Sequence, residues 1–454
     1  MTGIASAALS RGISGVVPLT LVPVTLAYLG TELYGLWMAV VALTGMVAFA
    51  DLGLGNGLMT KLAPCYSSGD TDRARRYISS AYLALTVVAT VLCGTLWLLA
   101  PLLPWSSMFN VAAPAMESEA RAMALVCLTA FIANVPLSLV IRVQYAYQEV
   151  ARSNLWQAAG SAAALPLTVC AVRAELPPIA VVAATVVGPL LTNIVNSVWL
   201  YGWRRRDLAP SLRMVDRGAA SVLLRLSGMF LVLTVVTSIA SNADALVVAQ
   251  ALGLEDTTAY AVPARVCTLL GFLVTLLNIP FWSAAGDALA RSDIAWVSRL
   301  TRRMSLLSVG TVGSAAGVLV LAGEDVLAVL VNGPFHTDHW LMGGLAAWWV
   351  LLAAISPRLM VQNAAGVIRP QLVGWLLYLV VSVPMKWYGA RHWGLAAVPW
   401  AGVTVYLVTV LPTAVYGYRV AMVRSAAADL EDRSGQRRPS PPSGPTLRKL
   451  TGRR

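Results

Sequence analysis

The sequence predicts an all-α polytopic membrane protein, with about twelve transmembrane helices in two pseudo-symmetric six-helix lobes. Of its 454 residues, 58% are hydrophobic and only 12% are charged, about half the charged fraction of an ordinary soluble domain. Apolar stretches of about twenty residues, the length that crosses a bilayer, recur from Gly12 to Val415. Matching residues also recur at a fixed offset between the two halves of the chain. The composition excludes a soluble enzyme, a secreted disulfide scaffold and a disordered protein.

Short polar breaks separate the apolar segments and define the candidate spans. The first segment is expected to be a retained helix rather than a cleaved signal, because no basic region precedes it. The twelve spans are predicted near residues 12–30, 35–59, 77–104, 120–141, 153–173, 177–202, 221–250, 257–285, 304–323, 340–361, 366–386 and 393–418.

The distribution of basic residues predicts the orientation of these spans. The chain carries a formal net charge of +12, from 33 basic and 21 acidic side chains. With twelve spans, 28 basic residues fall on the side of the two termini and only four, among them Lys386, on the other. Cytosolic loops carry the excess of Lys and Arg in membrane proteins, so we expect both termini in the cytosol, in the cell membrane. In such a chain the surplus indicates topology and lipid contact rather than nucleic-acid binding.

A comparison of the halves at an offset of 223 residues predicts an internal duplication. Gly30 meets Gly253, and an aspartate follows forty residues later in each half, at Asp70 and Asp293. An even number of helices per half makes the two copies parallel, as in two-lobed transporters. The predicted units are an N-terminal six-helix lobe (1–203), a cytosolic linker (204–220), a C-terminal six-helix lobe (221–418) and a disordered basic tail (419–454).

Three segments resemble a known transporter family. They are DLGLGNGLMTKLAPCYSSGDTDRARRYISSAYLAL (51–85), RVQYAYQEVARSNLW (142–156) and NIPFWSAAGDALARSDIAWVSR (278–299). They are similar to the connectors of polysaccharide-export flippases, the Wzx-type branch of the multidrug/oligosaccharidyl-lipid/polysaccharide superfamily. The resemblance implies a V-shaped, MATE-like fold that moves lipid-linked glycans from the inner to the outer leaflet.

Ionisable residues inside spans are the first candidates for a site, because each costs about 2.5–3.5 kcal/mol near the middle of a bilayer. Asp244 lies in the seventh span and Arg265 in the eighth. Adjacent antiparallel helices can bring the two together, either as a structural ion pair or with Asp244 holding an arginine that attracts a lipid-linked diphosphate. The flippase family often carries cavity arginines in this region, which favours the second reading. Asn242 lies in the same segment as Asp244 and joins the candidate substrate-binding residues.

A second group of candidates lies at the predicted cytosolic ends of helices. Asp51 and Asn56 belong to the glycine-rich stretch GLGNG and its flank, where the glycines indicate close helix packing or a bend rather than a nucleotide site. Lys61, Arg142 and Arg358 are expected either to anchor the helices in lipid headgroups or to form a basic mouth that collects an anionic substrate.

No motif in the chain indicates a cofactor or a catalytic site. The outer-loop sequence HTDH (336–339) has metal-ligating residue types but no evident third ligand, so no metal site is expected. We therefore expect a transporter, not an enzyme, that flips a polyprenyl-diphosphate-linked oligosaccharide by alternating access. Its expected partners are this anionic glycan, membrane lipids and, as further candidates, glycan-assembly enzymes. The alternatives are a cation-coupled drug exporter of the same superfamily, which commonly needs an acid in the first helix, or a membrane-embedded glycan polymerase or glycosyltransferase. A scaffold that recruits partners through the basic tail is a weaker option.

Overall fold

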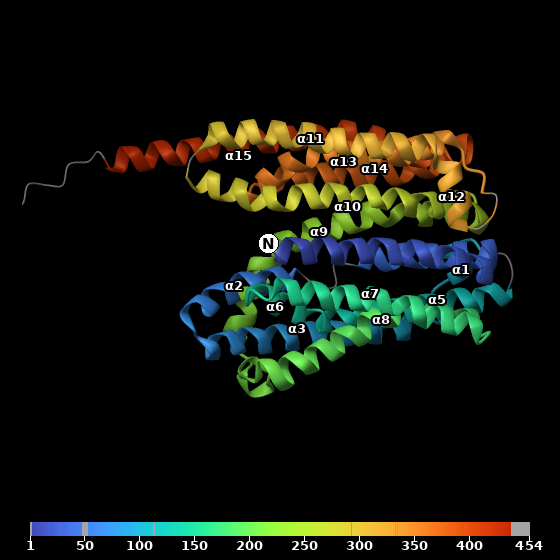
Figure 1. Cartoon of the computed structure of the whole chain (residues 1–454), viewed down its shortest axis with the longest axis horizontal. Helices are drawn as coiled ribbons and strands as arrows, with labels where there is room; N and C mark the ends of the chain where they lie inside the picture. Colours follow the sequence, from blue (N-terminus) through green and yellow to red (C-terminus); the bar gives the residue numbers. More distant parts are fainter. Residues whose placement is uncertain are drawn as a thin grey trace, which may run out of the picture.

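The computed structural model describes residues 2–47, 53–111, 114–291, 293–331, 333 and 335–436, and nearly all of them are helical (Figure 1). The first half of the chain forms α1 (Thr2–Met46), α2 (Leu54–Ser68), α3 (Thr71–Leu99), α4 (Trp105–Phe109), α5 (Pro114–Leu137), α6 (Leu139–Ala146), α7 (Val150–Arg173) and α8 (Pro178–Trp199). Three short helical turns follow, at Leu200–Arg204, Arg206–Leu208 and Leu212–Met214. The second half forms α9 (Arg217–Ala251), α10 (Leu254–Ala290), α11 (Ile294–Leu321), α12 (Gly323–Val331), α13 (His339–Ala364), α14 (Arg369–Trp393) and α15 (Ala397–Gln436).

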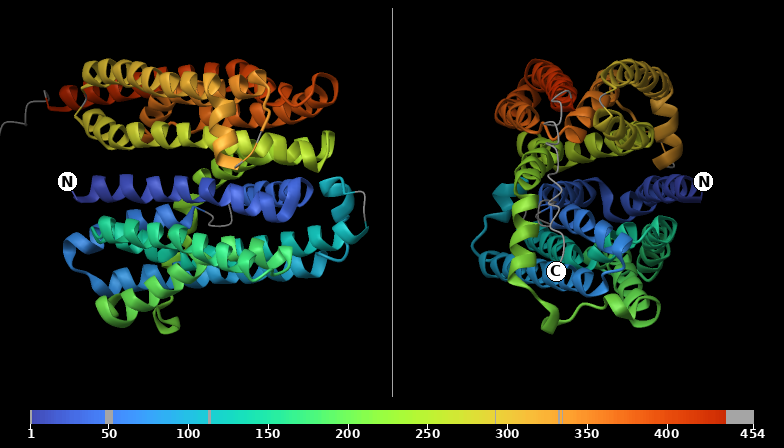
Figure 2. Two further views of the ribbon diagram at one scale, coloured as in Figure 1. Left: turned by 45° about the vertical axis from the view of Figure 1, so that its right-hand side comes forward. Right: turned by 90° about the vertical axis from the view of Figure 1, so that its left-hand side faces the viewer.

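The helices form two bundles that lie side by side (Figures 1 and 2). Helices α2, α3 and α5–α8 belong to one bundle, and α9–α11 and α13–α15 to the other. Helix α1 lies between them, against α7 of the first bundle and against α9 and α10 of the second. This arrangement confirms the predicted fold class of an all-α membrane protein with two lobes.

The helix α1 contains two spans joined by a sharp turn. Gly30 has φ 75° and ψ 174°, outside the helical region, and divides α1 into two arms. Pro18 from the first arm and Trp37 from the second line the same cavity, so the arms run back along each other. Eleven helices of the described part are long and apolar enough to cross a membrane, and the first of them, Gly15–Met46, contains both arms. The count agrees with about twelve spans.

The internal duplication is visible in the turns that link the first two helices of each half. Gly30 and Gly253 both have positive φ, of 75° and 111°, a conformation that glycine adopts without strain. Asp70 accepts a hydrogen bond from the Arg73 amide at 2.9 Å, and Asp293 accepts one from the Trp296 amide at 3.0 Å. Each aspartate therefore caps the helix that follows it. The residues that match in sequence hold equivalent positions in the two halves.

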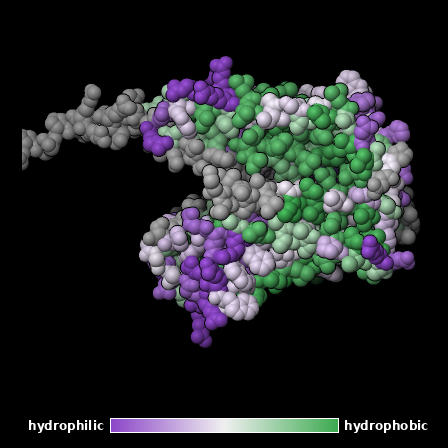
Figure 3. Space-filling view, in the orientation of Figure 1, coloured by the Kyte–Doolittle hydropathy of each residue, from purple (hydrophilic) through white to green (hydrophobic). Residues whose placement is uncertain are grey.

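The two bundles are in contact at one end and separate toward the other. The starts of α3 and α11, which carry many of the arginines, lie at the end that we call the basic end (left in Figure 1). At the opposite, distal end Gln250 of α9 donates hydrogen bonds to the Ser107 and Met108 carbonyls, at 2.8 and 2.7 Å. Thr258 of α10 donates to the Thr31 carbonyl at 2.5 Å. Figure 3 shows the molecule hollowed at the basic end, between two groups of hydrophilic side chains.

The connector between the bundles is anchored on α3. Arg75 Nε donates to the Ala209 carbonyl at 2.8 Å, and the Ser80 hydroxyl both accepts from the Asp216 amide and donates to its carbonyl, at 2.9 and 3.1 Å. The Arg205 guanidinium lies 4.5 Å from the centre of the Tyr147 ring. Burial raises the pKa of Tyr147 to about 12, so this phenol stays neutral. These hydrogen bonds hold the connector against α3.

The structure differs from the prediction in three ways. The span predicted near 35–59 is divided, because Gly53 adopts a left-handed conformation and α2 starts at Leu54. The tail predicted to be disordered from residue 419 is helical up to Gln436, where alanine, leucine and arginine favour helix; residues 437–454 lie outside the described residues. The short helices α4 and α12 were not predicted, because they are too short to give a periodic signal.

Candidate functional site: a cavity between the bundles

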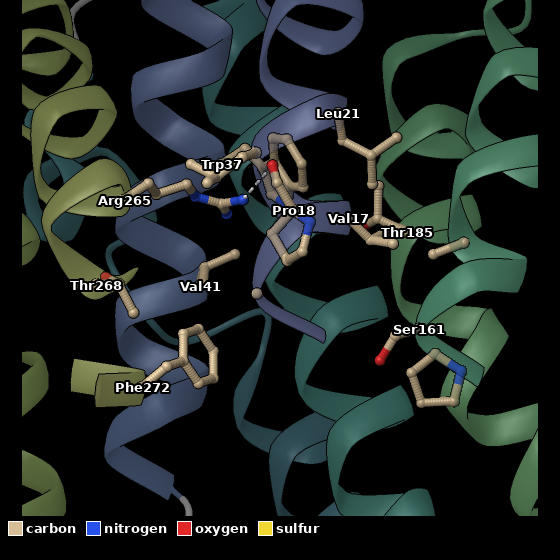
Figure 4. Close-up of a pocket in the computed structure, with 14 residues that line it drawn as sticks. Val17, Pro18, Leu21, Trp37, Val41, Ser161, Thr185, Arg265, Thr268 and Phe272 are labelled. Atoms are coloured by element: carbon tan, nitrogen blue, oxygen red, sulfur yellow. Dashed lines mark hydrogen bonds between the residues drawn. The ribbon is translucent and has the colours of Figure 1, made fainter. Parts of the chain in front are cut away.

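One hollow, which we call the central cavity, lies between the two bundles. It has a volume of about 370 Å³. Both arms of α1 line it together with α7 and α8 of one bundle and α10 of the other (Figure 4). Its walls are mostly apolar, and the polar groups come from Ser161, Thr185, Thr268 and Arg265.

Arg265 carries the charge of this cavity. Its guanidinium reaches from α10 toward α1, where Nη1 donates to the Pro18 carbonyl at 3.4 Å and the group lies 5.6 Å from the centre of the Trp37 ring (Figure 4). Within the described residues, no carboxylate lies within 4.0 Å of it. A guanidinium remains protonated in proteins, so Arg265 presents an uncompensated positive charge to the cavity.

Arg265 also borders a second hollow of about 240 Å³, which we call the side hollow. Asp244 and Asn242 from α9, Tyr260 from α10 and Trp348 from α13 line it. Asn242 donates to the Ser238 carbonyl at 2.8 Å and packs against Gly45 of α1, where a side chain would collide with its amide. Three candidates from the sequence, Arg265, Asp244 and Asn242, therefore lie around one space.

The predicted ion pair between Asp244 and Arg265 is wrong. Asp244 Oδ1 accepts a hydrogen bond from Lys386 Nζ of α14 at 2.5 Å, and its Oδ2 accepts one from the Tyr260 hydroxyl at 2.8 Å. Lys386 Nζ donates in addition to the Tyr378 hydroxyl at 3.1 Å. The sequence suggested the arginine because α9 and α10 are consecutive, whereas the packing of α14 against α9 supplies the actual partner.

Lys386 is the main functional candidate that the sequence analysis missed. It was placed on the outer side of the membrane, at the end of a span, but α14 continues to Trp393 and the lysine is only 2% exposed. Two features of the sequence could have pointed to Lys386: the chain has few lysines, and this one directly follows an apolar segment. Lys386 balances the charge of Asp244, which leaves Arg265 as the unbalanced charge among the described residues that line the two hollows.

The remaining candidates lie elsewhere. Asp51 falls outside the described residues, and Asn56 belongs to α2. Lys61 lies in α2 as well, half-buried and away from the two hollows. Arg142 packs against Gly55 of α2, where a Cβ atom would lie 3.0 Å from its Nε, so this glycine serves close packing.

Arg358 and Asp338 of the HTDH segment form hydrogen bonds with nearby residues. Arg358 Nη1 donates to the Ala354 carbonyl at 3.0 Å and approaches the Ser305 hydroxyl of α11 at 3.5 Å. Asp338 accepts from the Trp340 amide at 2.9 Å and caps α13. Among the residues that the structure describes, no group of three or more His, Cys, Asp or Glu side chains could hold a metal ion.

The same fold, two helical bundles with a cavity between them, is found in solved structures of membrane transporters. An inward-facing multidrug resistance MATE transporter of the MOP superfamily has a TM-score of 0.70 and 17% identity, covering 95% of this chain and 96% of its own. A MOP superfamily transporter from Pyrococcus furiosus, described by the reverse polarity of its binding pocket, has a TM-score of 0.69 and 17% identity over 94% and 95% of the two chains. An outward-facing MATE structure has a TM-score of 0.66 and 16% identity, over 94% of this chain and 96% of its own.

Sequence comparisons place the chain in a family. The profile of the polysaccharide biosynthesis protein family matches residues 1–281. A protein named as an O-antigen transporter in Salmonella typhi is 22% identical over 417 residues, which cover 89% of this chain and 93% of that protein. The chain belongs to the polysaccharide biosynthesis protein family, and the resemblance noted in the sequence is confirmed.

Proposed function

We propose that the protein flips a polyprenyl-diphosphate-linked oligosaccharide, a precursor of a cell-surface polysaccharide, from the inner to the outer leaflet of the cell membrane. The observation that carries this proposal is the unbalanced Arg265 guanidinium in a cavity between two bundles. A positive charge in a space of low dielectric attracts a diphosphate strongly. The family and the O-antigen transporter relative support a glycan as the group attached to it.

The transport cycle follows from the arrangement of the bundles. The space at the basic end admits the diphosphate and glycan, while the lipid tail stays in the bilayer. The excess of arginine at this end supports its assignment to the cytosol, with both termini on that side. Separation of the contacts at the distal end, such as those of Gln250, then opens the cavity to the outer leaflet.

The charge of the cavity also bears on the alternatives. A cation-coupled drug exporter needs an acid that is free to bind a cation, whereas Asp244 is held by Lys386 and Tyr260. Arg265 is the charged residue in the lining of the central cavity, and its positive charge favours an anionic substrate.

Deletion of the gene tests this function in the cell. We expect a lipid-linked oligosaccharide to accumulate on the inner leaflet, and the wild-type gene to clear it. Arg265→Ala should fail to clear it, and Arg265→Lys should clear part of it. The matched control is Arg391→Ala, which removes an exposed arginine stacked on Trp387. No accumulation on deletion, or full clearance by Arg265→Ala, would contradict the proposal.

A further inference from the structure

A second pocket in the first bundle carries polar groups without charge. We call it the amide pocket; it has a volume of about 230 Å³ and lies among α5–α8. Its polar and aromatic lining consists of Asn134, Ser138, Trp156, Gln157, Thr192 and Asn193. Amides, hydroxyls and one indole, with no ionised side chain, form a lining suited to a neutral polar ligand.

The amide pocket adjoins the central cavity. Ser161 and Pro189 line both spaces, so the two spaces share part of one wall. Helices α7 and α8 approach closely at this boundary, because a Cβ atom on Gly188 would lie 2.7 Å from the Gly160 carbonyl. Figure 4 shows Ser161 on the wall of the central cavity across from Arg265. A molecule bound near Arg265 can therefore extend a second group into the amide pocket.

Two amide pairs link α8 to the neighbouring helices, and they differ in one respect. Gln144 and Asn196 exchange two hydrogen bonds, at 2.7 and 3.2 Å, so each amide is satisfied by the other. Asn193 and Asn134 share only one, from Asn193 Nδ2 to Asn134 Oδ1 at 2.9 Å. Within the described residues, the side-chain atoms Asn134 Nδ2 and Asn193 Oδ1 have no hydrogen-bond partner. Only the second pair lines the pocket, and Asn193 is 7% exposed.

Gln157 adds a third amide that is held in place. Its Nε2 donates to the Tyr145 hydroxyl at 3.0 Å, and Tyr145 in turn donates to Asn154 Oδ1 at 2.9 Å. This chain orients the side chain of Gln157 before any ligand arrives, and such preorganisation favours binding. Beside Gln157, Asn134 and Asn193 are held by their shared hydrogen bond and offer the pocket a donor, Asn134 Nδ2, and an acceptor, Asn193 Oδ1.

We propose that the amide pocket binds an uncharged sugar unit of the transported glycan through its hydroxyl or N-acetyl groups, and that it sets the sugar specificity of transport. The inference rests on the proposed function and divides recognition between two places. Arg265 binds the diphosphate, while Asn134 and Asn193 bind the sugar. Adjacent hydroxyls or an N-acetyl group supply both donors and acceptors, which match the two unpaired amide groups. The Trp156 indole offers an apolar surface for the ring of the sugar.

Binding of defined lipids to the purified protein tests this division. The probes are a polyprenyl diphosphate without sugar and two forms of it that carry one N-acetylhexosamine or one hexose. We expect the wild type to bind at least one glycosylated probe about tenfold more tightly than the bare lipid, the effect of one or two hydrogen bonds. The variant Asn134→Leu/Asn193→Leu should lose this difference and keep its affinity for the bare lipid diphosphate.

The matched control is Gln144→Leu/Asn196→Leu, which removes the neighbouring amide pair outside the pocket. Replacement of both partners by apolar groups of similar shape is nearly neutral for folding, and the control should keep the preference for the sugar. Arg265→Ala should weaken the binding of all three probes equally. Equal binding of all probes by the wild type, or a preference retained in Asn134→Leu/Asn193→Leu, would overturn the sugar site. Unchanged binding in Arg265→Ala would instead count against the proposed function.

Discussion

Asp244 and Lys386, which lie 142 residues apart in the sequence, form an ion pair between α9 and α14 beside the side hollow. The lysine side chain is 3% exposed and that of the aspartate 24%. Tyr260 and Tyr378 complete the pair with one hydrogen bond each. The pair joins α9 to α14 at the wall of the side hollow.

Removal of the lysine should destabilise the protein more than removal of both charges. Lys386→Met leaves Asp244 without its counter-ion, and loss of one partner of a buried pair costs about 3–5 kcal/mol. The double variant Lys386→Met/Asp244→Asn should recover most of this loss, because no charge remains unbalanced. Thermal unfolding of the purified variants measures both effects. A double variant less stable than the single one would show that the pair is not the source of the loss.

The contacts of Gln250 should hold the distal end closed. Gln250→Leu removes two hydrogen bonds between α9 and the carbonyls of α4, each worth about 0.5–1.5 kcal/mol. The population should therefore shift by about tenfold toward a state open at the distal end. Spin labels at Leu98 and Leu321, which are 78% and 86% exposed near the distal ends of α3 and α11, report the distance between the bundles.

For this measurement the exposed Cys170 and the partly exposed Cys93 are replaced by serine. We expect a longer distance between the labels in Gln250→Leu than in the wild type. An unchanged distance distribution would mean that other contacts keep this end closed.

The attachment of the connector between the bundles to α3 should depend on Ser80. The Ser80 hydroxyl is buried and pairs with both the amide and the carbonyl of Asp216. Ser80→Ala leaves the Asp216 amide without its partner, at a cost of about 1–3 kcal/mol, while the Asp216 carbonyl still accepts from the Ala220 amide. We expect faster proteolysis within residues 204–216, measured on the intact protein. Ser107→Ala, at the distal end, is the control and should be cleaved at the wild-type rate.

The membrane potential should drive outward transport. An anion that moves outward from a negative interior gains about 2.3 kcal/mol per charge for each 100 mV. In vesicles with a potassium gradient and an ionophore, an inside-negative potential should accelerate the outward movement of the lipid-linked glycan. A rate that does not respond to the potential would remove this driving force.

The sequence predicted the course of the chain well and the contacts of its site less well. Apolar segments locate helices such as α7 and α13 because a bilayer demands continuous apolar length. The matched glycines at 30 and 253 were found because a turn with positive φ restricts residue type. The partner of Asp244 was missed because contacts between distant helices leave no local signal.

The sequence analysis also missed the two asparagines of the amide pocket. Asn134 and Asn193 are uncharged, so they did not stand out beside the ionisable residues of the spans. Their importance lies in one shared hydrogen bond and two unused groups, which only the packing of α5 against α8 reveals. Arg265 was found because a charge in a span is rare and costly.

Transport in vesicles tests the central claim most directly. The purified protein is reconstituted with a polyprenyl-diphosphate-linked oligosaccharide that carries a fluorescent group, placed in the leaflet facing the basic end. A membrane-impermeant quencher on the other side then measures arrival in that leaflet. We predict that quenching rises with wild-type protein and stays near the protein-free level with Arg265→Ala, while Arg391→Ala behaves as the wild type. Quenching no faster with the wild type than in protein-free vesicles would contradict the account.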